Sequence, residues 1–291
     1  CMEGTIIRIL LGAAGGKSGL LTCISYSFLG FFYSGITPSA TGGQPMQLYE
    51  MKRDGNSVSS STVVLMVTAV CYKLVLVCIG TFLLIFQGKM LRQYLGRYFG
   101  LYLLGLFLNL AITLVVTGMI VLPQWIIAGA NIFDRLFVKL HLWKASGSVG
   151  RQEKVWCFVQ EYHRAVLFLK EHPGRLAAAF LLTFVQRNSA FVITWLVYCG
   201  MGLFGTNLWS VVFLQAAVTL AVDMLPVPGA QGITELVYRS AFAQIFIGGT
   251  LPVSMIVSRA ASFYVPMAVG LATVLWRMAR KAGKSEWKQA A

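Results

Sequence analysis

Charged residues are scarce in this chain of 291 residues, where Asp, Glu, Lys and Arg together make up 12% of the sequence. Soluble domains carry about 25%. Hydrophobic residues make up 57%, so the composition excludes an ordinary soluble fold and indicates a membrane protein. Acidic residues are the rarer sign, and the net charge of +14 is concentrated beside the apolar runs. That placement fits anionic lipid headgroups, and no nucleic-acid-binding signature accompanies it.

Motifs for chemistry are also missing. The six cysteines form no CxxC pair and lie mostly in apolar segments, which argues against a disulfide framework or a zinc site. The sequence contains no HExxH motif, nucleophile elbow, P-loop or paired-carboxylate pattern, and all three histidines lie between residues 128 and 175. We therefore expect that the protein is not an enzyme and that it uses no metal or cofactor.

Long apolar runs are abundant. Four of them can cross the roughly 30 Å of membrane hydrocarbon, which takes about 20 helical residues. These runs are 58–86, 98–127, 176–198 and 250–276. Two more, 20–36 and 207–225, each end at a cluster of Pro and Gly. The sequence thus predicts an all-α, polytopic integral membrane protein with a single transmembrane domain over residues 1–291.

The interrupted runs divide the chain into two halves. The first half, 20–127, contains a re-entrant motif at 37–51, and the second half, 176–276, contains one at 225–248. Counting the crossings makes the two broken hairpins enter the membrane from opposite faces. This is the pattern of an inverted repeat.

Two basic segments set the predicted orientation. The connector 128–175 has eight Lys and Arg against four acids, and the tail 277–291 has five against one. The positive-inside rule places both in the cytoplasm, although the basic loop 87–97 then falls outside. Within the connector, VWCFVQEYHRAVLFL repeats apolar residues at helical spacing. Such a helix could lie on the membrane surface or pack on its own protein.

Two short motifs stand where the interrupted runs end: PSATGG at 38–43 and PGAQGI at 228–233. Backbone groups freed by Pro and Gly are tolerated at membrane depth only when they are buried in protein or line a wet cavity. A matched pair of such interruptions points to a transporter's central site, and the helix N-termini that follow suit an anion. The alternative is a pair of tight interhelical turns with no ligand.

Charged residues inside the apolar runs point to the same place. Lys73, Arg187 and Arg259 lie within three of the runs, while Asp223 precedes the second motif and Glu235 and Arg239 follow it. A charge at membrane depth is costly, so each should face a partner or water. Four cations against two carboxylates predict an anionic substrate. Structural pairing or snorkelling of individual cations is the alternative.

The segments TPSATGGQPMQLY, LPVPGAQGITE and SRAASFYVPMAVG, in this order, resemble the lysylphosphatidylglycerol synthase transmembrane region. This is the flippase part of the bacterial multiple peptide resistance factor, which also occurs as a stand-alone membrane protein. The resemblance runs from about residue 20 to 276. It implies two re-entrant segments, location in the bacterial plasma membrane, translocation of aminoacylated phosphatidylglycerol between leaflets, and a role in resistance to antimicrobial peptides.

The resemblance carries site residues to both motifs. At the first it implies Gly42, Gly43 and Gln44. At the second it implies Pro226, Pro228, Gly229, Gly232 and Glu235, with Arg259 on the following helix. Relatives often have an acidic residue at the position of Gln44, an Arg at that of Gln47 and a glycine at that of Ala230. The full set of candidate substrate-binding residues is Thr41, Gly42, Gly43, Gln44, Gln47, Lys73, Arg187, Asp223, Pro226, Pro228, Gly229, Gln231, Gly232, Glu235, Arg239 and Arg259.

The function predicted from these observations is a flippase for an anionic or aminoacylated phospholipid. Lys73, Arg187 and Arg259 would bind the phosphate, and Asp223 and Glu235 would balance them or contact an aminoacyl ammonium group. The alternatives are a secondary transporter of a small soluble anion and a membrane-bound lipid-modifying enzyme or its accessory subunit. The expected partners are the lipid substrate, anionic headgroups at the connector and tail, a second copy of the chain, and a separate lipid aminoacyl-transferase, since the sequence holds no synthetase domain.

Overall fold

The structure, a computed structural model, describes residues 1–122, 124–125, 128–129, 132, 148–247 and 249–290, and these contain helices and no strands. The all-α prediction is therefore confirmed. The part of the predicted connector at 130–131 and 133–147 lies outside the described residues. The helices are α1 (Met2–Ala13), α2 (Leu20–Ile36), α3 (Gly43–Arg53), α4 (Val58–Phe86), α5 (Gly88–Leu95), α6 (Phe99–Val121), α8 (Ser148–Lys170), α9 (Pro173–Gly200), α10 (Leu208–Val222), α11 (Ile233–Phe242), α12 (Thr250–Arg259) and α13 (Val265–Ala290).

Among the described residues, four helical stretches are long and apolar enough to cross a membrane, as predicted. They are Val58–Phe86, Gly88–Val121, Pro173–Gly200 and Thr250–Arg280. Their ends follow from local chemistry. The Ser57 hydroxyl caps α4 by accepting a hydrogen bond from the Ser60 N–H at 3.3 Å, and Pro173 begins α9, where its missing N–H costs nothing. The chain is thus a polytopic membrane protein.

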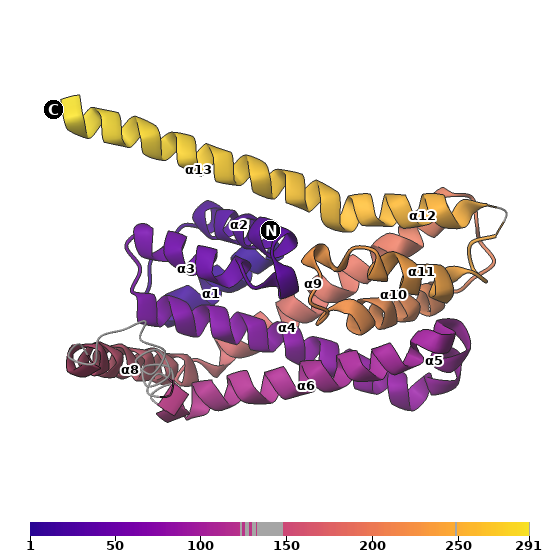
Figure 1. Ribbon diagram of the computed structural model, residues 1–291, viewed down its shortest axis with the longest axis horizontal. Coiled ribbons are helices and arrows are strands. Elements are labelled where there is room, and N and C mark those ends of the chain that lie inside the picture. The colour runs from indigo at the N-terminus through magenta and orange to yellow at the C-terminus, as the bar shows by residue number, and fades with distance from the viewer. Residues whose placement is uncertain (123, 126–127, 130–131, 133–147, 248, 291) are drawn as a thin grey trace.

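Two helix hairpins lie in opposite halves of the molecule (Figure 1). The first hairpin, α2 and α3, lies at the end that also holds α8, and the second hairpin, α10 and α11, lies toward α5. With 17 and 15 residues, α2 and α10 are shorter than the roughly 20 residues of a typical membrane-spanning helix. Their re-entrant character stays a prediction, as does the division of the chain into cytoplasmic and membrane segments.

The apolar core has two parts. The larger surrounds α10, whose Val211, Leu214, Ala217 and Leu220 are buried against α4, α6, α9 and α11. A helix that is apolar on all sides is either buried in a core or faces lipid, and the buried side chains of α10 show that it is enclosed by the other helices. The smaller part surrounds α1, which packs on α2, α4 and α9.

The apolar stripe of the connector packs on the protein itself. Val159, Tyr162, Val166 and Leu169 of α8 are buried, and α8 lies along α4. The Tyr162 hydroxyl donates to the carbonyl of Met119 at 3.3 Å. Of the two interpretations of this stripe, packing on the protein is the one that the structure shows.

Candidate substrate site at the paired breaks

The two interrupted segments meet inside the fold. The first break is a 3₁₀ turn at Pro38–Ala40 and the second is a 3₁₀ turn at Pro228–Ala230. They lie against each other, and α2 also contacts the second break. Two motifs 190 residues apart in the sequence are therefore joined at one place, where the two hairpins face one another.

The breaks share one backbone pattern. The residues before the prolines, Thr37 and Val227, are extended, with ψ of 145° and 131°, because a residue that precedes proline avoids the helical region. Each turn is closed by the same bonds: the Ala40 and Ala230 amides donate to the Thr37 and Val227 carbonyls at 3.3 and 2.9 Å. The likeness of the two motifs is thus conformational as well as chemical.

A new helix begins after each break; at the first, the Gly42 N–H donates to the Thr37 hydroxyl at 2.9 Å and Pro45 has no N–H, which leaves the amides of Gly43 and Gln44 at the start of α3. No side chain caps the N-terminus of α3 at Gly43 or that of α11 at Ile233. The first N–H groups of a helix have no intrahelical partner, and the helix dipole makes this end partly positive. The meeting point of the breaks is therefore suited to an anion.

One ion pair connects α4 to the end of α10. The Lys73 ammonium lies 2.5 Å from a carboxylate oxygen of Asp223, and the Tyr72 hydroxyl donates to the other oxygen at 2.6 Å. Both charged side chains are mostly buried. Asp223 directly follows α10, five residues before Pro228, so the pair stands on the approach to the second break.

Arg187 of α9 adds a cation to this pair. Its guanidinium carbon lies 4.7 Å from the centre of the Tyr72 ring, a cation–π distance, and Tyr72 itself holds Asp223. The Nε–H of Arg187 is buried without a hydrogen-bond partner among the described residues. A buried donor of this kind is rare in folded proteins, which makes Arg187 a candidate for a hydrogen bond to a bound ligand or water.

A second ion pair holds the second break from the other side. Arg259, the last residue of α12, donates from Nε to Glu235 at 2.8 Å and from Nη2 to the Gly229 carbonyl at 3.0 Å. Gly229 has φ of +59°, a backbone conformation that favours glycine. The second carboxylate oxygen of Glu235 is buried and accepts no hydrogen bond from the described part of the chain.

The remaining candidates differ in their surroundings. Gly42 and Gly43 lie in or beside the first turn of α3, and Gly232 caps α11. Gln47 is buried, and its amide donates to Glu3 and to the Tyr26 carbonyl at 3.2 and 3.1 Å. The candidates that are exposed at or beside the breaks are Thr41, Gln44, Pro226, Pro228 and Gln231, and Arg239 is exposed in the last turn of α11.

Arg239 pairs with no acidic side chain among the described residues. Lys73 and Arg187 lie with Asp223 just before the second break, and Arg259 lies with Glu235 at the break itself, so three cations stand against two carboxylates. The net charge of this group is positive, which agrees in sign with the charge balance seen in the sequence.

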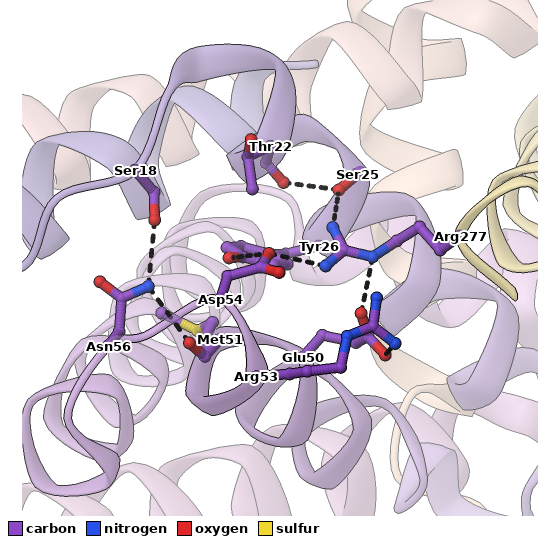
Figure 2. Close-up of polar contacts among 10 residues, drawn as sticks. All are labelled: Ser18, Thr22, Ser25, Tyr26, Glu50, Met51, Arg53, Asp54, Asn56 and Arg277. Carbon is purple, nitrogen blue, oxygen red and sulfur yellow. Dashed lines mark hydrogen bonds and ion pairs between the residues drawn. The ribbon is translucent and has the colours of Figure 1, made fainter. Parts of the chain in front are cut away.

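Sequence reasoning missed a network between the first hairpin and α13 (Figure 2). Arg277 donates to Glu50 and Asp54 at 2.6 Å each and to the Ser25 hydroxyl at 2.7 Å. The Tyr26 hydroxyl donates to Asp54 at 2.6 Å. The sequence places Arg277 in a basic tail, whereas in the structure only 7% of it is exposed. The available signal was a pair of carboxylates four residues apart, Glu50 in the last turn of α3 and Asp54 directly after it.

A surface hollow lies away from the breaks, between α1 and α2. It is lined by Arg8, Gly12, Gly16, Lys17, Ser18 and Gly19. The Ser18 hydroxyl accepts a hydrogen bond from Asn56 at 3.0 Å, which ties this loop to the turn before α4 (Figure 2).

Comparison with known proteins agrees with this architecture. Residues 4–270 match the family model described as the lysylphosphatidylglycerol synthase TM region. The UPF0104 membrane protein PH1989 of Pyrococcus horikoshii is 26% identical over 258 residues, which cover 85% of this chain and 74% of that protein. No solved structure matches the chain. Since the match covers nearly the whole sequence, the chain belongs to the lysylphosphatidylglycerol synthase transmembrane-region family.

Proposed function

We propose that this protein is a flippase that moves a phospholipid with an anionic or aminoacylated headgroup between the leaflets of a membrane. The observation that carries the proposal is the contact between the two breaks, which belong to hairpins from opposite halves of the molecule. A headgroup held there would lie midway between the two ends. Membership of a family whose name refers to a lipid supports the choice of substrate.

The charges around the second break favour a phosphate. Lys73, Arg187 and Arg259 outnumber the carboxylates, and the Arg187 Nε–H has no acceptor in the described part of the protein. A phosphate oxygen would supply that acceptor. The unpaired oxygen of Glu235 is suited to the ammonium of an aminoacylated headgroup.

Exposure at the breaks favours a lipid over a small soluble anion. Gln44, Pro228 and Gln231 are exposed at the surface of the helix bundle. A soluble anion needs a closed, water-lined cavity, whereas a lipid must keep its tails in the membrane while its headgroup passes. Exposed residues at the breaks are compatible with a headgroup that passes through the protein while its tails stay in the membrane.

The proposed setting is the cell membrane, with α8 and the C-terminal end of α13 on the cytoplasmic side, as the positive-inside rule predicts. An aminoacylated substrate would be made by a separate lipid aminoacyl-transferase. A homodimer remains an expectation, and so do contacts of anionic headgroups with the basic connector and tail.

The test is a dithionite-quench assay in proteoliposomes that contain fluorescent phosphatidylglycerol or its lysyl form. Wild type should speed the loss of inner-leaflet signal, and Arg259→Gln should remove most of this acceleration. Arg97→Gln is the matched control. Arg97 is exposed in the loop after α5, so its substitution removes the same charge far from the breaks.

Two results would contradict the proposal. One is no acceleration by wild-type protein with either lipid, combined with uptake of inorganic phosphate or another soluble anion into the vesicles. The other is equal loss of activity in Arg259→Gln and Arg97→Gln, which would separate the activity from the paired breaks.

A further inference from the structure

Two arginines on the C-terminal helices bind different hairpins. Arg259, at the end of α12, binds Glu235 and the Gly229 carbonyl of the second hairpin. Arg277, on α13, binds Glu50 of the first hairpin and Asp54 directly after it. One continuous stretch of chain therefore connects both hairpins by buried charges.

A π-helical turn, Ala260–Tyr264, separates the two attachment points. Such a turn interrupts the regular hydrogen-bond ladder, and π turns recur at functional sites. The packing changes at this turn: α12 lies on α9 and α11, whereas α13 lies along α2 (Figure 1). The helices that pack against α12 and α13 thus change at the π-helical turn between them.

The contact between α13 and α2 is tight. A Cβ atom at Gly270 of α13 would lie 2.7 Å from the Phe28 carbonyl oxygen of α2. Backbones this close leave no room for sliding, since the obstacle is main chain rather than a flexible side chain. At the far end of the same contact, Arg277 adds its hydrogen bonds to Ser25, Glu50 and Asp54 (Figure 2).

We propose that α13 moves with α2 and α3 as one rigid body, that the π-helical turn is the hinge between this body and α12, and that Arg277 is the positioning residue that fixes α13 to the first hairpin. The inference rests on the proposed function, because the motion would open and close the path at the paired breaks. It assigns the Arg277 network a role in transport, apart from substrate binding.

The chemistry of the network requires an arginine. The guanidinium uses three nitrogens for three acceptors on α2, α3 and the turn after α3. A lysine keeps the charge but is a point donor without this planar fork. Arg277→Lys should therefore retain part of the coupling, and Arg277→Gln should lose it.

The test measures two intramolecular distances between spin labels by pulsed electron resonance, in an active variant whose native cysteines are replaced. The labelled positions are Tyr49 on α3, Val253 on α12 and Met278 on α13, which are 50%, 53% and 62% exposed. Measurements are compared in nanodiscs of phosphatidylcholine with and without phosphatidylglycerol. We expect the 49–278 distance to stay single and unchanged, and the 49–253 distance to shift when phosphatidylglycerol is present.

Variants connect the distances to transport. Arg277→Gln should broaden the 49–278 distribution and lower the flipping rate about tenfold, a typical effect for residues that couple sites. Arg277→Lys should fall between it and wild type. Arg280→Gln, exposed on α13 and outside the network, is the control.

The inference would be overturned by a 49–253 distance that is identical in both membranes, by a 49–278 distance that shifts as much as the 49–253 distance, or by an Arg277→Gln variant that flips lipid at the wild-type rate. Wild-type protein that shows the expected distances without moving any lipid would retain the hinge and reject the proposed function. The proposed hinge and the proposed flippase function can thus be rejected independently of each other.

Discussion

Ala40 and Ala230 occupy equivalent places in the two breaks and share a left-handed backbone, with φ of 55° and 50°. They are the two non-glycine residues with positive φ in the described part of the chain. Strain of this kind persists only where the surroundings impose it, and it clusters at functional sites. Its repetition at the contact of the two hairpins supports a shared role for the two motifs.

Glycine at either position should relieve this strain. The left-handed conformation costs an L-residue about 1–2 kcal/mol, and glycine returns about 0.5–1 kcal/mol of that as unfolded-state entropy. We expect Ala40→Gly and Ala230→Gly to unfold at or slightly above the wild-type temperature. Ala40→Val and Ala230→Val should unfold at a lower temperature, as followed by tryptophan fluorescence in detergent. A valine variant as stable as wild type would contradict the assignment.

A side chain at Gly43 should force the first hairpin apart. Its Cβ would lie 2.6 Å from the Gly30 carbonyl oxygen, which belongs to the backbone of α2. Overpacking of this kind costs about 1–3 kcal/mol. We expect Gly43→Ala to lower the midpoint of thermal unfolding. Gly100→Ala is the control, because nothing lies within 4 Å of a Cβ there. Equal midpoints for the two variants would show that α2 and α3 tolerate separation.

Much of the fold could be predicted because its determinants are local. Run length and composition identify Val58–Phe86 and the other three spans, since a membrane requires about 20 apolar residues whatever surrounds them. The two breaks can be predicted because Pro and Gly change the backbone conformations that are available at their own positions, whatever the rest of the fold does. The positions of Lys73 and Asp223 were found for a similar reason, as each is an isolated charge within or beside an apolar run.

The network of Arg277 could not be found in this way. Its partner Glu50 lies far away in the sequence, and nothing in a basic C-terminal segment distinguishes one buried arginine from its exposed neighbours. Gln47 was assigned to the substrate for its place in a motif, whereas the structure shows it bonded to Glu3 and Tyr26. Both contacts depend on how α1, α2, α3 and α13 pack, which periodicity does not specify.

Removal of the Asp223 charge should destabilise the protein more than removal of the whole ion pair. Asp223→Asn leaves Lys73 buried with Arg187 nearby and no carboxylate, and an uncompensated buried charge costs about 3–5 kcal/mol. The double variant Lys73→Met, Asp223→Asn removes that charge, so it should recover most of the thermal stability. If Lys73 also binds the lipid phosphate, the double variant should flip lipid more slowly than wild type even though its thermal stability has recovered. Full recovery of both properties would make the pair purely structural.

Acid should weaken the contact between α13 and the first hairpin. Burial alone would raise the pKa of Asp54, but hydrogen bonds from Arg277 and Tyr26 and the nearby guanidinium charges outweigh it, so the pKa lies below its ordinary value. A carboxyl group with a lowered pKa stabilises the folded state fully above its unfolded pKa of about 3.9 and loses this contribution as the pH falls further. We therefore expect the midpoint of thermal unfolding to drop below about pH 4 in wild type. Arg277→Gln removes the main cause of the lowered pKa, so its midpoint should depend less on pH over the same range. Parallel pH profiles for the two proteins would show that Asp54 is not held by Arg277.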